Sequence, residues 1–185
     1  MRILLVTTRK LVAMAALTAA ALIMFVIEAQ IPLPFPIPGV KLGLANTVTL
    51  IALFFGEAKR KESGGPGVPR ISLTAVDAFM ILTCRIILGA VFTGRFVALL
   101  YSIAGGLFAF AAQVIMRRFV TAKQIWVCGV IGAVFHNIGQ IAAAMLITGT
   151  VLIAAYLPLL LVAGIATGVM TGLAAQVILM RTVWG

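Results

Sequence analysis

The sequence predicts an all-α membrane protein, built as one bundle of six transmembrane helices, and two observations support this fold class. First, 63% of the 185 residues are hydrophobic and only 10% are charged, whereas a soluble domain has about 45–50% apolar and about 25% charged residues. Second, the apolar residues form six runs, none with the two-residue period of a β-barrel strand. This composition excludes a soluble enzyme, a disordered chain and a free nucleic-acid-binding protein, so we expect no nucleic acid among its partners.

Each apolar run predicts one helix, because about 20 apolar residues cross a hydrocarbon core of about 30 Å. The first run follows basic residues, as in a signal peptide, but its length of about 20 residues exceeds the usual 7–15, and we interpret it as a true helix. The second run is short, and the sixth is long enough to tilt or to project from the bilayer. The predicted helices are Leu11–Ile31, Leu42–Phe55, Ile71–Val91, Phe96–Met116, Ile125–Ile147 and Val151–Met180.

The basic residues indicate the orientation of the bundle. Of the 14 Lys and Arg residues, eleven lie near the termini or in the loops after the second and fourth predicted helices, whereas only Lys41 and Arg95 lie on the other side. Because cytoplasmic loops concentrate Lys and Arg, we expect both termini in the cytoplasm. Residues 1–185 are then a single domain, in which residues 57–70 form a flexible cytoplasmic loop.

The third predicted helix carries two charged residues, Asp77 and Arg85. Each costs about 2.5–3.5 kcal/mol near the bilayer centre, so both require partners inside the bundle. At 1.5 Å per residue, Asp77 lies about 10 Å and Arg85 about 22 Å from the cytoplasmic end of this helix, and the two are not expected to pair. Glu28, near the outer end of the first helix, lies at the depth of Arg85.

Other polar residues share this outer depth. Lys41 and Asn46 lie at the start of the second helix, and His136 and Gln140 share one face of the fifth because they are four residues apart. Any one of them could simply hydrogen-bond a neighbouring helix, but as a set they predict an outward-opening polar chamber for a small polar or anionic solute. A single histidine without cysteine ligands predicts no metal site, and we expect no cofactor. The expected substrate-binding residues are Glu28, Lys41, Asn46, Arg85, His136, Asn137 and Gln140.

Small residues indicate where helices approach closely. Gly164, Gly168 and Gly172 form a ridge that predicts packing within the bundle. The first helix carries an alanine face for which two interpretations remain open, packing within the bundle and docking of a partner subunit. The residues of this face are Ala15, Ala16, Ala19 and Ala20.

Three segments carry a resemblance to a known family: EAQIPLPFPIPG after the first helix, KLGLAN (Lys41 to Asn46), and GAVFHNIGQ on the fifth helix. Together they resemble the bacterial membrane family labelled heptaprenyl diphosphate synthase component I, also called the Gx transporter family. That family is similar to the S components of energy-coupling factor (ECF) transporters, the substrate-binding subunits of vitamin uptake systems.

The resemblance implies a six-helix S-component-like fold in the bacterial cytoplasmic membrane, with solute held near the extracellular side. It also implies that the alanine face meets a membrane T subunit, while separate ATPase subunits hydrolyse ATP. The enzyme label does not suit the residues, because prenyl synthases bind magnesium diphosphate through paired aspartate-rich motifs and this chain has one aspartate, Asp77. We therefore expect no enzyme. Two alternatives remain, an accessory membrane component of prenyl diphosphate or quinone biosynthesis, and a stand-alone ion-coupled carrier with Asp77 as its proton site.

Overall fold

The computed structural model describes residues 8–30, 43–61, 73–94 and 96–183, and within these ranges the chain is helical with no strand. The prediction of an all-α fold is confirmed. Five helices are long and apolar enough to cross a membrane, and α2 carries a shorter apolar segment, Asn46–Phe55. The elements are α1 (Thr8–Gln30), α2 (Asn46–Lys61), α3 (Ala75–Thr93), α4 (Phe96–Met116), the 3₁₀ turn η1 (Ala122–Gln124), α5 (Ile125–Thr148), the 3₁₀ helix η2 (Val151–Tyr156) and α6 (Leu157–Val183).

The largest difference from the predicted boundaries concerns α2. It begins at Asn46 rather than at Leu42, because Gly43 has a left-handed backbone (φ +82°) and belongs to a turn before the helix. It then continues through Lys61, so residues 57–61 of the predicted loop are helical, while residues 62–70 of that loop lie outside the described residues. The sixth predicted helix is also divided, since η2 precedes α6.

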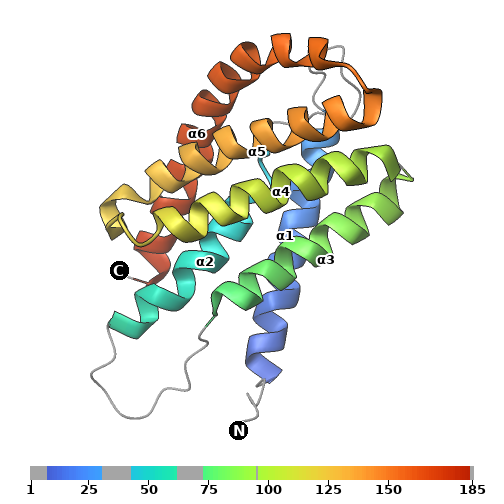
Figure 1. Cartoon of the computed structure of the whole chain (residues 1–185). Helices are drawn as coiled ribbons and strands as arrows, with labels where there is room; N and C mark the ends of the chain where they lie inside the picture. Colours follow the sequence, from blue (N-terminus) through green and yellow to red (C-terminus); the bar gives the residue numbers. More distant parts are fainter. Residues whose placement is uncertain (1–7, 31–42, 62–72, 95, 184–185) are drawn as a thin grey trace, which may run out of the picture.

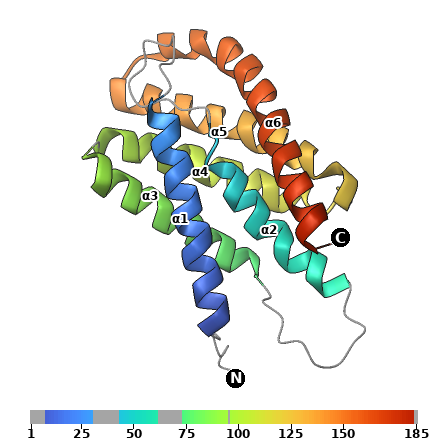
Figure 2. The same cartoon turned by 180° about the vertical axis from the view of Figure 1, so that it is seen from behind.

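The helices form a single bundle around α2, which packs against each of the other five. The remaining contacts run from α1 to α3, α3 to α4, α4 to α5 and α5 to α6. Figures 1 and 2 show that the start of α1, the end of α2, the start of α3 and the end of α6 lie towards the same end of the bundle. This alternation agrees with the order of spans that the sequence predicts, and the membrane side of each end stays a prediction.

The glycine ridge of α6 packs against α5, as predicted. A Cβ atom on Gly172 would lie 2.6 Å from the carbonyl oxygen of Trp126, and one on Gly168 would lie 2.7 Å from Cα of Val130. Such distances leave room only for hydrogen, so the two helices are in backbone contact along this seam.

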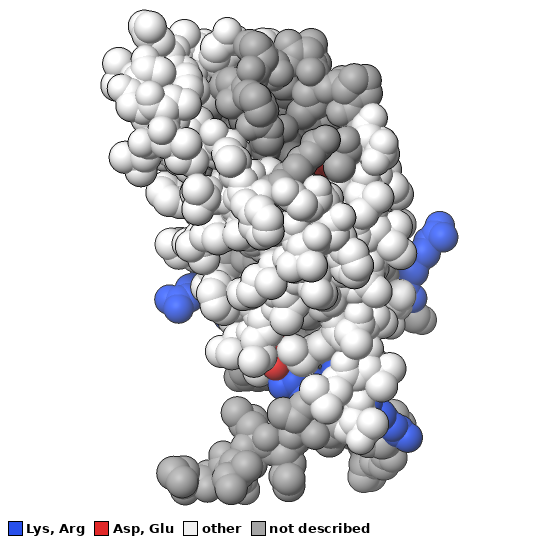
Figure 3. Space-filling model, turned by 90° about the vertical axis from the view of Figure 1, so that its right-hand side faces the viewer, with Lys and Arg blue, Asp and Glu red and all other residues white. Residues whose placement is uncertain are grey.

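The outer surface of the bundle is apolar. Large side chains stand exposed on it, including Phe92, Phe96, Leu146 and Met170, and Figure 3 shows one face on which most of the described surface carries no charge. A patch of this extent is typical of a surface in contact with lipid, and the chain is a multi-pass membrane protein.

Candidate functional site

The turn before α2 connects α1 to α2 and α5. The backbone N–H of Gly43 donates a hydrogen bond to Oε1 of Glu28 on α1, and its carbonyl oxygen accepts one from the N–H of Asn46 at 2.9 Å. A Cβ atom on Gly43 would lie 3.0 Å from Nδ2 of Asn46 and 3.2 Å from Cδ2 of His136. Glycine is therefore required here both for its left-handed conformation and for this close approach.

Arg85 is the only basic residue within the described part of α3, and it is 4% exposed. Its Nη2 donates a hydrogen bond to Oδ1 of Asn46 at 3.2 Å, and the carboxylate of Glu28 lies close enough to stabilise its charge. Two donors beside this contact, Nε of Arg85 and Nδ2 of Asn46, are buried with no hydrogen-bond partner among the described residues. The site therefore has donor groups that an acceptor-rich molecule could use.

His136 and Gln140 come from the middle of α5, where they are 4% and 0% exposed. Both lie against Gly105 of α4, where a Cβ atom would be 2.8 Å from two ring atoms of His136 and 2.9 Å from Cγ of Gln140. Gly43 lies near the other edge of the imidazole. Four helices and one turn thus bring five expected residues together, and we call them the polar cluster: Glu28, Asn46, Arg85, His136 and Gln140.

The structure places Asn137 on another side of α5. Its Nδ2 donates a hydrogen bond to the carbonyl oxygen of Leu160 at 2.6 Å, and its amide lies over Gly164 of α6. A buried amide that bridges two helices in this way fixes their relative position. Asn137 therefore adjoins the polar cluster without facing it.

A small cavity adjoins the polar cluster among the described residues, and the outward-opening chamber stays a prediction. The cavity beside Asn46 measures about 10 Å³, the room that one water molecule needs. Its lining includes Thr47 and Thr171, to which the sequence assigned no role, and Gln113. As a single polar residue in the apolar run AFAAQVIM, Gln113 is expected from the sequence to lie close enough to the membrane surface to be wetted, but it is 2% exposed, and that expectation is wrong.

Asp77 has local partners near the start of α3. Its Oδ2 accepts a hydrogen bond from the N–H of Thr74 at 2.6 Å, and its own N–H donates to Oγ1 of Thr74 at 3.3 Å, which together form a capping box. The same Oδ2 also accepts from the hydroxyl of Thr74 at 2.8 Å and pairs with Nζ of Lys10 at 2.7 Å. As expected, it does not pair with Arg85, whose contacts lie elsewhere. The capping bonds and the ion pair are sufficient to explain an acidic residue at this position structurally.

The remaining expected residues are separate from the cluster. Lys41 lies outside the described residues. The alanine face of α1 is exposed, whereas Ala21 and Phe25 of the same helix are buried in the bundle. Packing within the bundle is thus excluded for Ala15, Ala16, Ala19 and Ala20, and docking of a partner stays a prediction.

The chain as a whole matches a family model. The model described as heptaprenyl diphosphate synthase component I covers residues 17–61 and 69–178, which is most of the chain. The chain therefore belongs to that family. No curated protein and no solved structure matches it.

Proposed function

We propose that this member of the heptaprenyl diphosphate synthase component I family is the solute-binding subunit of a small-molecule uptake transporter in the bacterial cytoplasmic membrane. The observation that carries the proposal is the burial of Arg85 beside Asn46 and Glu28, with unused donors at this contact. An ionisable residue at membrane depth is costly, and in membrane proteins such residues mark solute and ion pathways.

The unused donors favour an anionic or acceptor-rich solute. A buried donor without a partner costs about 1–3 kcal/mol, and both Nε of Arg85 and Nδ2 of Asn46 are in this state in the described residues. A carboxylate or carbonyl group of a solute could accept from both atoms. In this role Arg85 and His136 donate to the solute, Asn46 and Gln140 orient it, Glu28 balances the charge, and Asn137 positions α5. Lys41 would add a further donor.

Solute entry requires the side chains of the polar cluster to separate. The cavity beside Asn46 is about 10 Å³, far below the 300–1,000 Å³ of typical small-molecule sites. In this proposal the solute selects a more open arrangement of these side chains. The exposed alanine face of α1 would dock on a membrane T subunit, and separate ATPases would supply the energy, with both termini of the chain in the cytoplasm.

Native mass spectrometry of the purified protein, with release and identification of retained small molecules, tests the proposal. Wild type is expected to retain a small polar molecule, and Arg85→Met to lose it at least tenfold. Arg181→Met, which alters an exposed arginine at the end of α6, is the matched control and should retain it. The double variant Glu28→Gln/Arg85→Met removes both buried charges and should be folded yet empty. Full retention by that double variant would refute the assignment of the site.

A second candidate function is supported by the description of the family itself, namely a non-catalytic membrane component of prenyl diphosphate synthesis. The single aspartate, Asp77, forms a helix cap, which is why we infer a subunit without its own prenyl transfer chemistry. This candidate predicts stable copurification with a soluble synthase and no requirement for ATPase subunits. Solute uptake that depends on ATPase subunits would favour the first candidate.

A further inference from the structure

An apolar groove lies between α4 and α5, distinct from the polar cluster. Its volume is about 600 Å³, within the usual range of small-molecule sites. Every lining side chain is apolar, with Phe108, Ala111 and Ile115 on α4 and Ile131 and Phe135 on α5. The groove opens on the outer surface, since Phe108, Ala111, Ile115 and Phe135 are exposed. An apolar chain from the surrounding bilayer can therefore enter it from the side.

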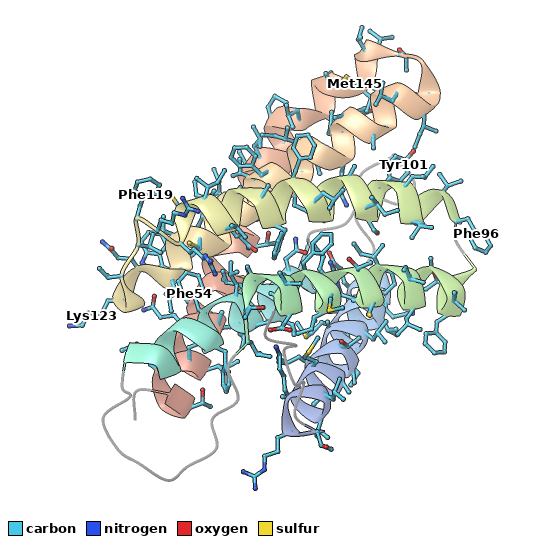
Figure 4. The ribbon with its side chains drawn as sticks, turned by 60° about the horizontal axis from the view of Figure 1, so that its bottom comes forward. Phe54, Phe96, Tyr101, Phe119, Lys123 and Met145 are labelled. Carbon is cyan, nitrogen blue, oxygen red and sulfur yellow. The ribbon has the colours of Figure 1, made fainter. Side chains whose placement is uncertain are left out.

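One end of the groove meets the basic connection between α4 and α5. The N–H of Arg118 donates to the carbonyl oxygen of Ile115 at 3.2 Å, and that of Phe119 to the carbonyl oxygen of Met116 at 2.9 Å. The chain thus keeps winding past α4, and Arg118 lies one turn beyond Ile115, which lines the groove. Arg118 and Lys123 are both exposed. Figure 4 shows Phe119 and Lys123 together at this end, far from Phe96 and Tyr101.

The charged residues of the segment from α4 to α5 all have the same sign. No aspartate or glutamate occurs between Phe96 and Thr148, whereas Arg117, Arg118 and Lys123 all lie in the connection. Basic residues at the end of a cleft between transmembrane helices are the feature that recognises phosphate headgroups of lipids. The charge of this end is therefore complementary to a lipid that carries an apolar chain below an anionic phosphate.

We propose that the α4–α5 groove is a specific binding site for an anionic phospholipid of the bilayer. One acyl chain lies along the groove over Ala111, and the headgroup phosphate lies between Arg118 and Lys123. The two features belong together, because the groove supplies a chain-shaped apolar cavity and the connection supplies charge at the depth of the headgroup. This site is independent of the polar cluster and of the solute that we propose for it.

The experiment reconstitutes the full chain in nanodiscs of equal phosphatidylglycerol and phosphatidylcholine, and counts lipids retained after extraction by native mass spectrometry. Wild type should retain phosphatidylglycerol in preference to phosphatidylcholine. Ala111→Phe fills the groove and should lose the retained lipid of either kind, while Ala166→Phe on the exposed face of α6 should not. Arg118→Gln/Lys123→Gln should reduce the preference by about fivefold for each charge removed.

A matched pair, Arg9→Gln/Arg181→Gln, removes two exposed charges elsewhere and should leave the preference unchanged. If this pair lowers retention as much as Arg118→Gln/Lys123→Gln, the effect is bulk attraction and the proposal is wrong. Unchanged retention by Ala111→Phe would also overturn it. Added heptaprenyl diphosphate is a final arm, and displacement of phosphatidylglycerol at equal concentration would assign the groove to a prenyl chain and overturn the phospholipid assignment.

Discussion

The two ends of the bundle are held together in different ways. Towards the end of α2 and of α6, apolar side chains from four helices form a continuous core that includes Leu53, Ile81, Ile125 and Leu179. Around the start of α2, the helices meet through the polar cluster. Glu28 accepts a hydrogen bond from the backbone of Gly43, Arg85 donates one to Asn46, and two buried donors have no partner among the described residues. We infer that the apolar end supplies stability, and that the polar end can therefore retain buried polar groups that cost free energy.

The largest loss of folded protein is expected from Gly172→Leu, which disrupts the α5–α6 seam. A Cβ atom there would lie 2.6 Å from the carbonyl oxygen and 2.7 Å from Cα of Trp126, so only movement of the backbone could admit it. Overpacking of a core typically costs about 1–3 kcal/mol when side chains can adjust, and here they cannot. We expect little or no monodisperse folded protein by size-exclusion chromatography in detergent.

The control for this variant is Ala166→Leu, a substitution of similar size on the exposed face of α6. It should elute like wild type and unfold at the same temperature. If Gly172→Leu behaves like this control, the seam is not a source of stability and the contrast between the two ends is lost.

A smaller effect is expected in the polar cluster from Arg85→Met. Removal of one member of a buried charge pair typically costs about 3–5 kcal/mol, because the other charge is left uncompensated. The nearby Glu28 would be in that position. Addition of Glu28→Gln should recover most of the loss, since glutamine can still accept the hydrogen bond from Gly43. Denaturant unfolding in mixed micelles measures both steps.

The outcome separates stability from function in this region. Recovery of stability without recovery of solute retention is the expected combination. A double variant as unstable as Arg85→Met alone would mean that Glu28 and Arg85 are not coupled, and that the polar end depends on other contacts.

Most of the fold could be predicted from the sequence, because each apolar run carries its own signal. The predicted helix Phe96–Met116 coincides with α4, and the glycine ridge of α6 packs as predicted. The start of α2 could not be placed, because KLGLAN is apolar enough to continue a helix. The helix starts only at Asn46 because Gly43 has a left-handed conformation and its N–H donates a hydrogen bond to Glu28, a residue fifteen positions earlier.

For the candidate site, the residues that meet could be predicted from the sequence better than the free space among them. Depth along each helix was sufficient to group Glu28, Asn46 and Arg85. The direction of each side chain around its helix axis could not be predicted in the same way. For this reason Asn137 was expected in the cluster, whereas it faces α6. Free volume is still less predictable, since it depends on how fully His136 and Gln140 fill the space beside Gly105.

The smallest effect on stability is expected from Asp77→Asn. This variant tests whether a charged group outside the polar cluster matters less than one inside it. The variant keeps one acceptor for the N–H of Thr74 but loses the ion pair with Lys10. A capping interaction is typically worth about 1 kcal/mol, and the ion pair is largely buried, with side chains 15% and 9% exposed, so unfolding should become easier by about 1 kcal/mol or more. Thr74→Ala, which removes the capping hydroxyl and keeps the carboxylate, should cost a similar amount. Retention of solute and uptake should be unchanged in both variants, because the contacts of this carboxylate are with Thr74 and Lys10 and lie outside the polar cluster. If Asp77→Asn abolishes uptake while Thr74→Ala does not, the carboxylate takes part in transport, and an ion-coupled carrier would replace the solute-binding subunit as the better hypothesis.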